Sequence, residues 1–298
     1  LALYVWACWQ RPWGGRVALL GLVAPSTLAA VFYTETSLLV AALMIGGCRL
    51  VGRRPVLAGV LFGLLAFKPQ FGVLIPVALV SARQWRSVIA AGATVVLSVI
   101  ASGMIFGWAT WARLPGALAD VSRLVAGLPR VTQFSPTVTA GLRMLGAGPL
   151  LTDVVQFGAA AIAAIAVWLC FHRGVTALAA AALMVGAFLA TPYAFFYDLT
   201  LVSYAVLAIV IERHRSRDSF ATWEILVLIL AIALPLLFLF NPLRVPWGIV
   251  VLPLLFGLIL RRSARTGDPV MAVPGCHCCS DAGAMRSTSS HRAGSPSA

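Results

Sequence analysis

Apolar residues occur in long runs along this chain, and short polar segments separate the runs. A membrane-spanning helix needs about 20 mostly apolar residues, and fewer where neighbouring helices shelter it. On that basis the sequence predicts eleven apolar helices, at residues 1–10, 17–33, 37–51, 55–67, 70–82, 87–107, 151–171, 174–191, 198–211, 221–240 and 246–260. We therefore predict an all-α polytopic transmembrane bundle of about ten or eleven spans.

The polar segments between these runs alternate between two chemical kinds. One kind is basic and holds Arg11 and Arg16, Arg49, Arg53 and Arg54, Arg83 and Arg86, Arg173, Arg213, Arg215 and Arg217, and Arg261, Arg262 and Arg265. The other kind has few basic residues and comprises residues 33–36, 68–70, 108–150, 191–198 and 241–244. Because cytoplasmic loops are enriched in Lys and Arg, the basic kind and the C-terminus are predicted to be cytoplasmic and the other kind extracytoplasmic.

Composition supports a membrane protein and argues against a nucleic-acid-binding one. Hydrophobic residues make up 61% of the chain, charged residues only 10%, and the mean hydropathy is +0.96. The net charge of +13 comes mostly from arginines in short clusters between apolar runs. That distribution is typical of cytoplasmic loops, so we expect a lipid bilayer and no nucleic acid as a partner.

Lys68, the only lysine of the chain, interrupts the apolar stretch 55–82. If the stretch were one helix, Lys68 would lie at the bilayer centre, at a cost of about 2.5–3.5 kcal/mol or more. Proline disfavours the helical conformation in the residue before it, so Pro69 favours a break at Lys68. We predict a hairpin of two short helices with Lys68 at the extracytoplasmic surface.

The segment 108–150 is predicted to contain an amphipathic helix on the membrane surface. Its apolar face is formed by Leu114, Leu118, Val121, Leu124, Val125 and Leu128, opposite Arg113, Asp120 and Arg123. Packing of that face on neighbouring helix ends is an equally good interpretation.

The polar residues of the predicted outer surface suit a lipid-linked substrate. Lys68 offers a compact cation at headgroup depth for a phosphate, and Gln70 offers an amide for hydrogen bonds. Tyr193 and Tyr197, with the phenylalanines between them, can form a stacking wall, and Asp198 can accept a hydroxyl proton. The acids predicted near this surface are Glu35, Asp120, Asp153 and Asp198.

Structural roles are the alternative for each of these residues. An interfacial lysine can simply extend its amine to water, and tyrosines are common at membrane interfaces. Asp198 and Glu35 each precede an apolar run, where an acidic side chain can cap a helix.

Two segments resemble glycosyltransferase family 87. They are RRPVLAGVLFGLLAFKPQFGVLIPVALV (53–80), followed by RQWR, and ATPYAFFYDLTLV (190–202). The resemblance implies a GT-C-type membrane enzyme without metal or other cofactor, acting at the outer face of the bacterial plasma membrane. The implied donor is a polyprenyl-phosphate sugar, with mannose as the favoured hexose, and the acceptor is a glycolipid or glycan. Lys68, Gln70, Tyr193, Tyr197 and Asp198 occupy matching positions and are the implied substrate-binding residues.

The resemblance also implies an acidic catalytic base in the first outer loop. That loop is expected upstream of Leu1, so the chain is interpreted as truncated, and Glu35 and Asp198 are the candidates inside it. Thr34-Glu35-Thr36 stands where family members have a Gly-Gln-Asn-type motif. A secondary transporter and a noncatalytic fragment of the same family are the alternatives.

The C-terminal segment carries no predicted helix. We place the transmembrane domain at residues 1–262 and a disordered cytoplasmic tail at 263–298. Cys276, His277, Cys278 and Cys279 lie in this tail, but no second ligand pair follows at the spacing of a zinc finger. We therefore predict no metal site there.

Overall fold

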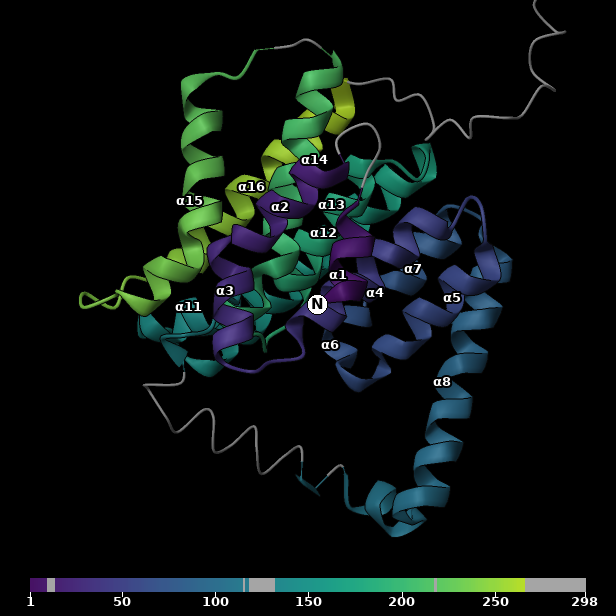
Figure 1. Cartoon of the computed structure of the whole chain (residues 1–298). Helices are drawn as coiled ribbons and strands as arrows, with labels where there is room; N and C mark the ends of the chain where they lie inside the picture. The colour runs from purple at the N-terminus through teal and green to yellow at the C-terminus, as the bar shows by residue number, and fades with distance from the viewer. Residues whose placement is uncertain (10–13, 115, 118–131, 217–218, 266–298) are drawn as a thin grey trace, which may run out of the picture.

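The computed structural model describes residues 1–9, 14–114, 116–117, 132–216 and 219–265, and these residues form a helical bundle without strands (Figure 1). The α-helices are α1 (Ala2–Cys8), α2 (Gly14–Val23), α3 (Pro25–Phe32), α4 (Ser37–Leu50), α5 (Pro55–Leu64), α6 (Pro69–Gly72), α7 (Ile75–Ser81), α8 (Trp85–Phe106), α11 (Val138–Met144), α12 (Pro149–Arg173), α13 (Ala177–Ala190), α14 (Thr200–Ser216), α15 (Thr222–Leu239) and α16 (Trp247–Arg265). Two 3-10 helices, η1 (Leu65–Phe67) and η2 (Phe196–Leu199), complete the order. The predicted all-α class is confirmed.

Four of these helices, α8, α12, α15 and α16, are long and apolar enough to cross a membrane. Shorter apolar helices cover Ser37–Leu50, Pro55–Phe67, Pro69–Ser81 and Ala177–Ala190. The centre of the bundle is formed by α13 and α14, which are buried along almost their whole apolar length. A helix that is apolar on every side can only be stable in such a position or in lipid. In contrast, α8 lies at the edge of the bundle and extends past it (Figure 1).

The run predicted at 17–33 is interrupted between α2 and α3. Pro25 has no N–H, so the carbonyl of Gly21 loses its helical partner. The Thr27 hydroxyl donates to that carbonyl at 2.6 Å, which restores the lost hydrogen bond. Ser26 and Ser203 also share a hydrogen bond of 2.7 Å, which ties α3 to α14. The polar residues after Pro25 therefore make the break tolerable inside an apolar bundle.

The helix break predicted at Lys68 is confirmed. Lys68 lies between η1 and α6 with φ −128° and ψ 71°, outside the helical region. The run after it differs from the prediction, because it divides into α6 and α7. Pro76 lies in the first turn of α7 and cannot donate a hydrogen bond to the previous turn.

The helix before this break, α5, packs closely on α8. A Cβ atom added at Gly59 or Gly63 would collide with the backbone carbonyl of Ser87 or Ala91. The Ser87 hydroxyl also donates to the Pro55 carbonyl at 2.8 Å. Small residues four apart allow this kind of backbone approach between membrane helices.

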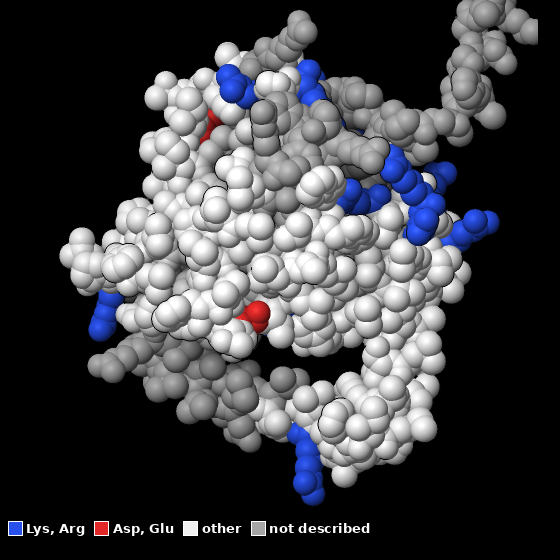
Figure 2. Space-filling view, in the orientation of Figure 1, with Lys and Arg blue, Asp and Glu red and all other residues white. Residues whose placement is uncertain are grey.

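Basic residues gather at one end of the bundle, which we call the arginine end. They occur in the last turns of α4, α12, α14 and α16. Figure 2 shows most of the Lys and Arg atoms in the upper half of the molecule. The helix ends therefore group by charge as the two kinds of polar segment predict.

A buried ionic network, the arginine cluster, joins α14, α15 and α16 at this end. Arg262 pairs with Glu224 at 2.8 Å and with Glu212 at 3.4 Å, and Arg261 lies 3.6 Å from Glu224. The side chains of Arg262 and Glu224 are almost fully buried. Sequence analysis assigned Arg261 and Arg262 only to a basic loop, so this network was missed.

The remaining predictions for the loop and the tail are only partly covered by the described residues. Residues 108–114 are helical, but Leu118, Val121, Leu124, Val125 and Leu128 of the predicted amphipathic helix lie outside the described residues. The last helix, α16, continues past residue 262 to Arg265. Cys276, His277, Cys278 and Cys279 also lie outside the described residues.

Candidate active site

Lys68 lies between two carboxylates that come from distant parts of the sequence. Its Nζ donates to Asp198 Oδ1 at 2.9 Å and lies 3.7 Å from Glu35 Oε2. Glu35 precedes α4, Lys68 interrupts the α5–α7 segment, and Asp198 belongs to η2. We call these three side chains the rim cluster, and they occupy the end of the bundle opposite the arginine end.

Asp198 is the buried member of the rim cluster. Its Oδ1 also accepts a hydrogen bond from the Ser37 hydroxyl at 2.7 Å, and its Oδ2 accepts one from the Phe195 N–H at 3.2 Å. Both oxygens therefore have donors, which stabilises the charged carboxylate in a buried position. The side chain closes the turn that begins at Phe195 and does not cap α14.

Glu35 is the accessible member. Its side chain is 32% exposed, against 17% for Lys68 and 4% for Asp198. The predicted capping of α4 by Glu35 is not observed, because Thr36 occupies the N-cap and that cap has no side-chain hydrogen bond. One ammonium faces two carboxylates, so the rim cluster has a net charge of −1, and Glu35 presents it to solvent.

Aromatic rings form a wall beside the rim cluster. Tyr193 packs edge-on against Phe195 at 5.1 Å between centroids, and Phe195 stacks on Tyr197 at 5.3 Å. The wall continues through Phe196 to Tyr33, whose ring contacts Phe196 at 5.2 Å. Lys68 Nζ lies 5.6 Å from the centroid of Tyr197, within the range of a cation–π interaction.

The two tyrosines of η2 and its preceding loop remain protonated over the physiological range. Burial raises the pKa of the Tyr197 phenol, and the negative charges of Glu35 and Asp198 raise it further. The same causes raise the pKa of Tyr193. Both side chains are therefore hydrogen-bond donors, and neither is a base.

The model of glycosyltransferase family 87 matches residues 1–192. This chain belongs to glycosyltransferase family 87. No curated protein and no solved structure matches it. The family assigns glycosyl transfer as the reaction, and the apolar helices place the glycosyltransferase in a membrane.

The family match covers only part of the rim cluster. It includes Glu35 and Lys68, whereas Asp198 lies beyond its end at residue 192. The association of Asp198, Tyr193 and Tyr197 with the site of this glycosyltransferase therefore rests on the geometry. Within the described residues, no three His, Cys, Asp or Glu side chains are grouped as metal ligands.

Gln70 is the predicted site residue for which no contact with the rim cluster is observed in the described part of the chain. It lies on α6 and is half-buried, and its side chain makes no hydrogen bond with the described part of the glycosyltransferase. Its amide is available to a ligand.

Two contributors to the site were missed by sequence analysis. Ser37 holds Asp198, and Tyr33 extends the aromatic wall. A signal for both was present, because they flank Glu35 in the polar segment YTETS. Nothing in the sequence, however, indicated that this segment lies beside residues 195–198.

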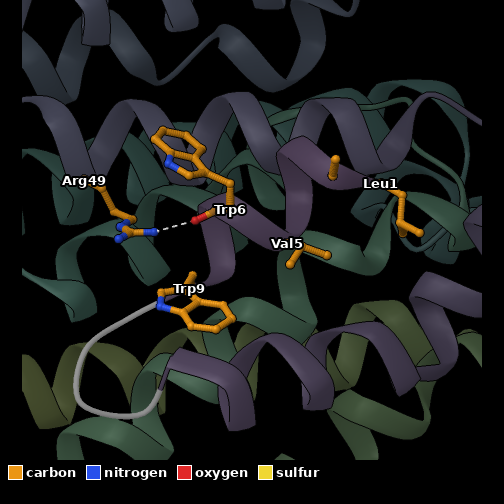
Figure 3. A pocket seen from close by; sticks show the side chains of 6 residues that line it. Leu1, Val5, Trp6, Trp9 and Arg49 are labelled. Atoms are coloured by element: carbon orange, nitrogen blue, oxygen red, sulfur yellow. Dashed lines mark hydrogen bonds between the residues drawn. The ribbon is translucent and has the colours of Figure 1, made fainter.

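Two apolar cavities of the glycosyltransferase are lined by none of the three residues of the rim cluster. One, of about 630 Å³, is lined by Leu1, Ala2, Val5, Trp6, Trp9 and Arg49 (Figure 3). Arg49 Nη1 donates to the carbonyls of Trp6 and Ala7 at 2.9 and 2.7 Å, so this cation satisfies the C-terminal carbonyls of α1. The second cavity lies beside α15 and has a volume of about 440 Å³.

Proposed function

We propose that this glycosyltransferase transfers mannose from a polyprenyl-phosphate sugar to a glycolipid or glycan acceptor at the outer face of the bacterial plasma membrane. The observation that carries the proposal is the rim cluster, which brings Lys68, Glu35 and Asp198 together at one end of an apolar bundle. Since the basic residues lie at the other end, the positive-inside rule favours an extracytoplasmic rim cluster and a cytoplasmic C-terminus.

Lys68 is proposed to contact the donor phosphate. An ammonium has three N–H donors, and Asp198 takes one of them at 2.9 Å. The buried carboxylate fixes the direction of the Lys68 side chain, so the remaining donors are positioned for a phosphate. Asp198 is thus a positioning residue, held in turn by Ser37.

The sugar is proposed to lie against the aromatic wall. Tyr193 is 41% exposed at one end of the wall, and Tyr197 lies next to Lys68. Protonated phenols can donate to sugar oxygens, and the half-buried amide of Gln70 can do the same from α6.

Glu35 is proposed as the general base within this chain. It is the more exposed carboxylate, whereas both oxygens of Asp198 already accept hydrogen bonds. The acceptor hydroxyl loses its proton to Glu35 as its oxygen bonds to the anomeric carbon. The bond from that carbon to the phosphate oxygen breaks, and polyprenyl phosphate leaves with the electron pair.

The test compares Glu35→Gln with Asp198→Asn in the full-length protein, using a radiolabelled polyprenyl-phosphate mannose donor. Loss of a general base lowers rates by about 10²–10⁴-fold, so Glu35→Gln is expected to lower kcat with little change in the donor KM. Asp198→Asn is expected to raise the donor KM, because Lys68 loses its orientation. Asp153→Asn, which changes an exposed acid on α12, is the matched control and should retain wild-type turnover.

Full turnover by Glu35→Gln would show that the base is another residue. Equal transfer from polyprenyl-phosphate glucose would contradict the assignment of mannose.

A further inference from the structure

The turn between α3 and α4 ends α3 with a Schellman motif. The N–H of Glu35 donates to the carbonyl of Ala30 at 2.9 Å, and the N–H of Thr34 donates to the carbonyl of Val31 at 3.1 Å. This pair of hydrogen bonds defines the motif and satisfies carbonyls that the last turn of a helix leaves without partners. The motif requires a left-handed residue directly before Glu35, and Thr34 has φ 56°.

Threonine is an unfavourable residue at this left-handed position. The conformation brings the Cβ atom close to the following carbonyl oxygen, and β-branching adds to the cost. The same pair of hydrogen bonds ends α11, where Gly146 holds the left-handed position with φ 80°. Glycine has no Cβ atom and adopts this backbone without strain. The strain at Thr34 is therefore offset by contacts of the residues around it.

Both sides of the strained turn are fixed to η2. Before the turn, the ring of Tyr33 packs edge-on against Phe196 at 5.2 Å between centroids. After the turn, the Ser37 hydroxyl donates to Asp198 Oδ1 at 2.7 Å. The strained backbone is thus held between two contacts with the segment that carries the aromatic wall and Asp198. Strain that surrounding contacts maintain in this way is typical of functional sites.

This turn sets the direction of Glu35. The residue that follows the left-handed position usually makes an apolar contact with the end of the helix. Glu35 instead extends to within 3.7 Å of Lys68 Nζ. Its backbone N–H is bound to Ala30, so the base of the side chain is already fixed. A fixed carboxylate loses less freedom when it meets an acceptor hydroxyl, which favours proton transfer.

We propose that Thr34 is a positioning residue, whose left-handed turn directs the Glu35 carboxylate to Lys68 and to the acceptor hydroxyl. The inference rests on the proposed role of Glu35 as the general base. The Thr34 side chain is exposed, and its hydroxyl makes no hydrogen bond with the described residues. The backbone conformation at this position, and not the chemistry of the side chain, therefore controls turnover.

The test compares Thr34→Pro with Thr34→Gly in the full-length protein, using the radiolabelled donor. Proline fixes φ at about −65° and excludes the left-handed turn, but it is common just after the end of a helix, so the variant should fold. Thr34→Pro should lower kcat at least about tenfold, toward the value of Glu35→Gln, with little change in the donor KM. The conservative variant Thr34→Gly keeps the left-handed turn and should retain turnover. An equal loss in both variants would assign the role to the side chain and overturn the proposal.

Arg83 provides the matched control. It holds the same left-handed position, with φ 54°, in the turn between α7 and α8. There the N–H of Gln84 donates to the carbonyl of Leu79 at 2.9 Å, and the N–H of Arg83 donates to the carbonyl of Val80 at 3.0 Å. Arg83→Pro should lower the thermal midpoint in detergent about as much as Thr34→Pro, but it should leave kcat unchanged. Equal losses of kcat in the two proline variants would show a purely structural role and overturn the proposal.

A second variant moves the carboxylate and keeps the turn. Glu35→Thr/Thr36→Glu places the acid one position later in the chain, so its kcat should fall as far as that of Glu35→Gln, with little change in the thermal midpoint. If Thr34→Pro and this double variant keep wild-type turnover while Glu35→Gln loses it, the positioning role is overturned and the proposed base stands. If Glu35→Gln itself keeps full turnover, the proposed base is wrong and the positioning role is overturned with it.

Discussion

The rim cluster and the arginine cluster are both built from charged side chains of distant segments, but their surroundings differ. In the arginine cluster, two arginines face two glutamates, and the Arg262 and Glu224 side chains are 4% and 3% exposed. In the rim cluster, one lysine faces two carboxylates, and Glu35 is open to solvent.

The arginine cluster and the rim cluster differ in whether their charges are balanced internally and in whether a ligand can reach them from solvent. Buried charges in an apolar bundle are tolerated when they are paired. The arginine cluster pairs its charges internally, and Glu224 Oε1, which accepts no hydrogen bond from the described residues, lies 3.6 Å from Arg261. The rim cluster is open to solvent at Glu35, has donors on Lys68 that remain available, and has a wall of aromatic rings beside it. These features leave room for a ligand, so we expect mutations in the two clusters to affect different properties.

The largest effect on stability is expected from Arg262→Ala. This change leaves the buried Glu224 carboxylate without its closest cation, and breaking a buried ion pair costs about 3–5 kcal/mol. The double variant Arg262→Met/Glu224→Leu should recover most of that loss, because the most deeply buried carboxylate is removed together with its cation and only the less buried Glu212 loses a partner. Thermal unfolding in detergent, followed by fluorescence-detected size exclusion, measures both.

The glycosyl-transfer activity of Arg262→Ala tests whether the arginine cluster has a role beyond stability. The folded fraction of Arg262→Ala should show wild-type turnover if the arginine cluster is only structural. A selective loss of turnover in well-folded protein would contradict this role.

Lys68→Ala is expected to have a smaller effect on stability but a large effect on activity. Asp198 keeps its hydrogen bonds from Ser37 and Phe195, so losing the third donor should cost about 1–3 kcal/mol. Removing a positioned donor to a developing negative charge typically lowers turnover by about 10²–10³-fold.

The double variant Lys68→Ala/Asp198→Asn distinguishes the two contributions. Neutralising the buried carboxylate should restore thermal stability, while transfer stays at the level of Lys68→Ala. If the double variant regains activity, Lys68 serves only to neutralise Asp198, and the phosphate contact is wrong.

The sequence was sufficient to predict the all-α class and the Lys68 break, although the runs predicted at 17–33 and 70–82 each divide into two helices. Apolar runs have no stable alternative to helix in a membrane, and Pro69 acts on its immediate neighbour, so both features are local. The break at Pro25 was also local, but the run around it was interpreted as one helix. The hydroxyls of Ser26 and Thr27 were the missed signal, since they supply the hydrogen bonds that such a break requires.

The contacts of the two clusters were beyond local reasoning. Lys68 and Asp198 are separated by 130 positions and Ser37 and Asp198 by 161, so their pairing depends on how the helices pack. Arg262 was indistinguishable in sequence from the neighbouring loop arginines. Its pairing with Glu212 and Glu224 follows only once α14, α15 and α16 are placed side by side.

The smallest expected effect concerns Tyr197, at the edge of the rim cluster. Burial and the nearby carboxylates raise the pKa of its phenol above the ordinary value of about 10. The folded state therefore holds this proton more tightly than the unfolded state, and the associated stability is lost as the pH rises above about 10. Because the ring is partly exposed, this contribution should stay below about 1 kcal/mol between about pH 9 and pH 11.

Tyr197→Phe removes the titrating group and keeps the ring. Its thermal midpoint should fall less than that of the wild type between those two pH values, and its turnover at neutral pH should change only a few-fold, because a protonated phenol is not the base. An identical alkaline loss in both proteins would mean that neither burial nor the charges of Glu35 and Asp198 raise the pKa of this phenol. Tyr197 would then be more exposed to water than its place beside the rim cluster indicates.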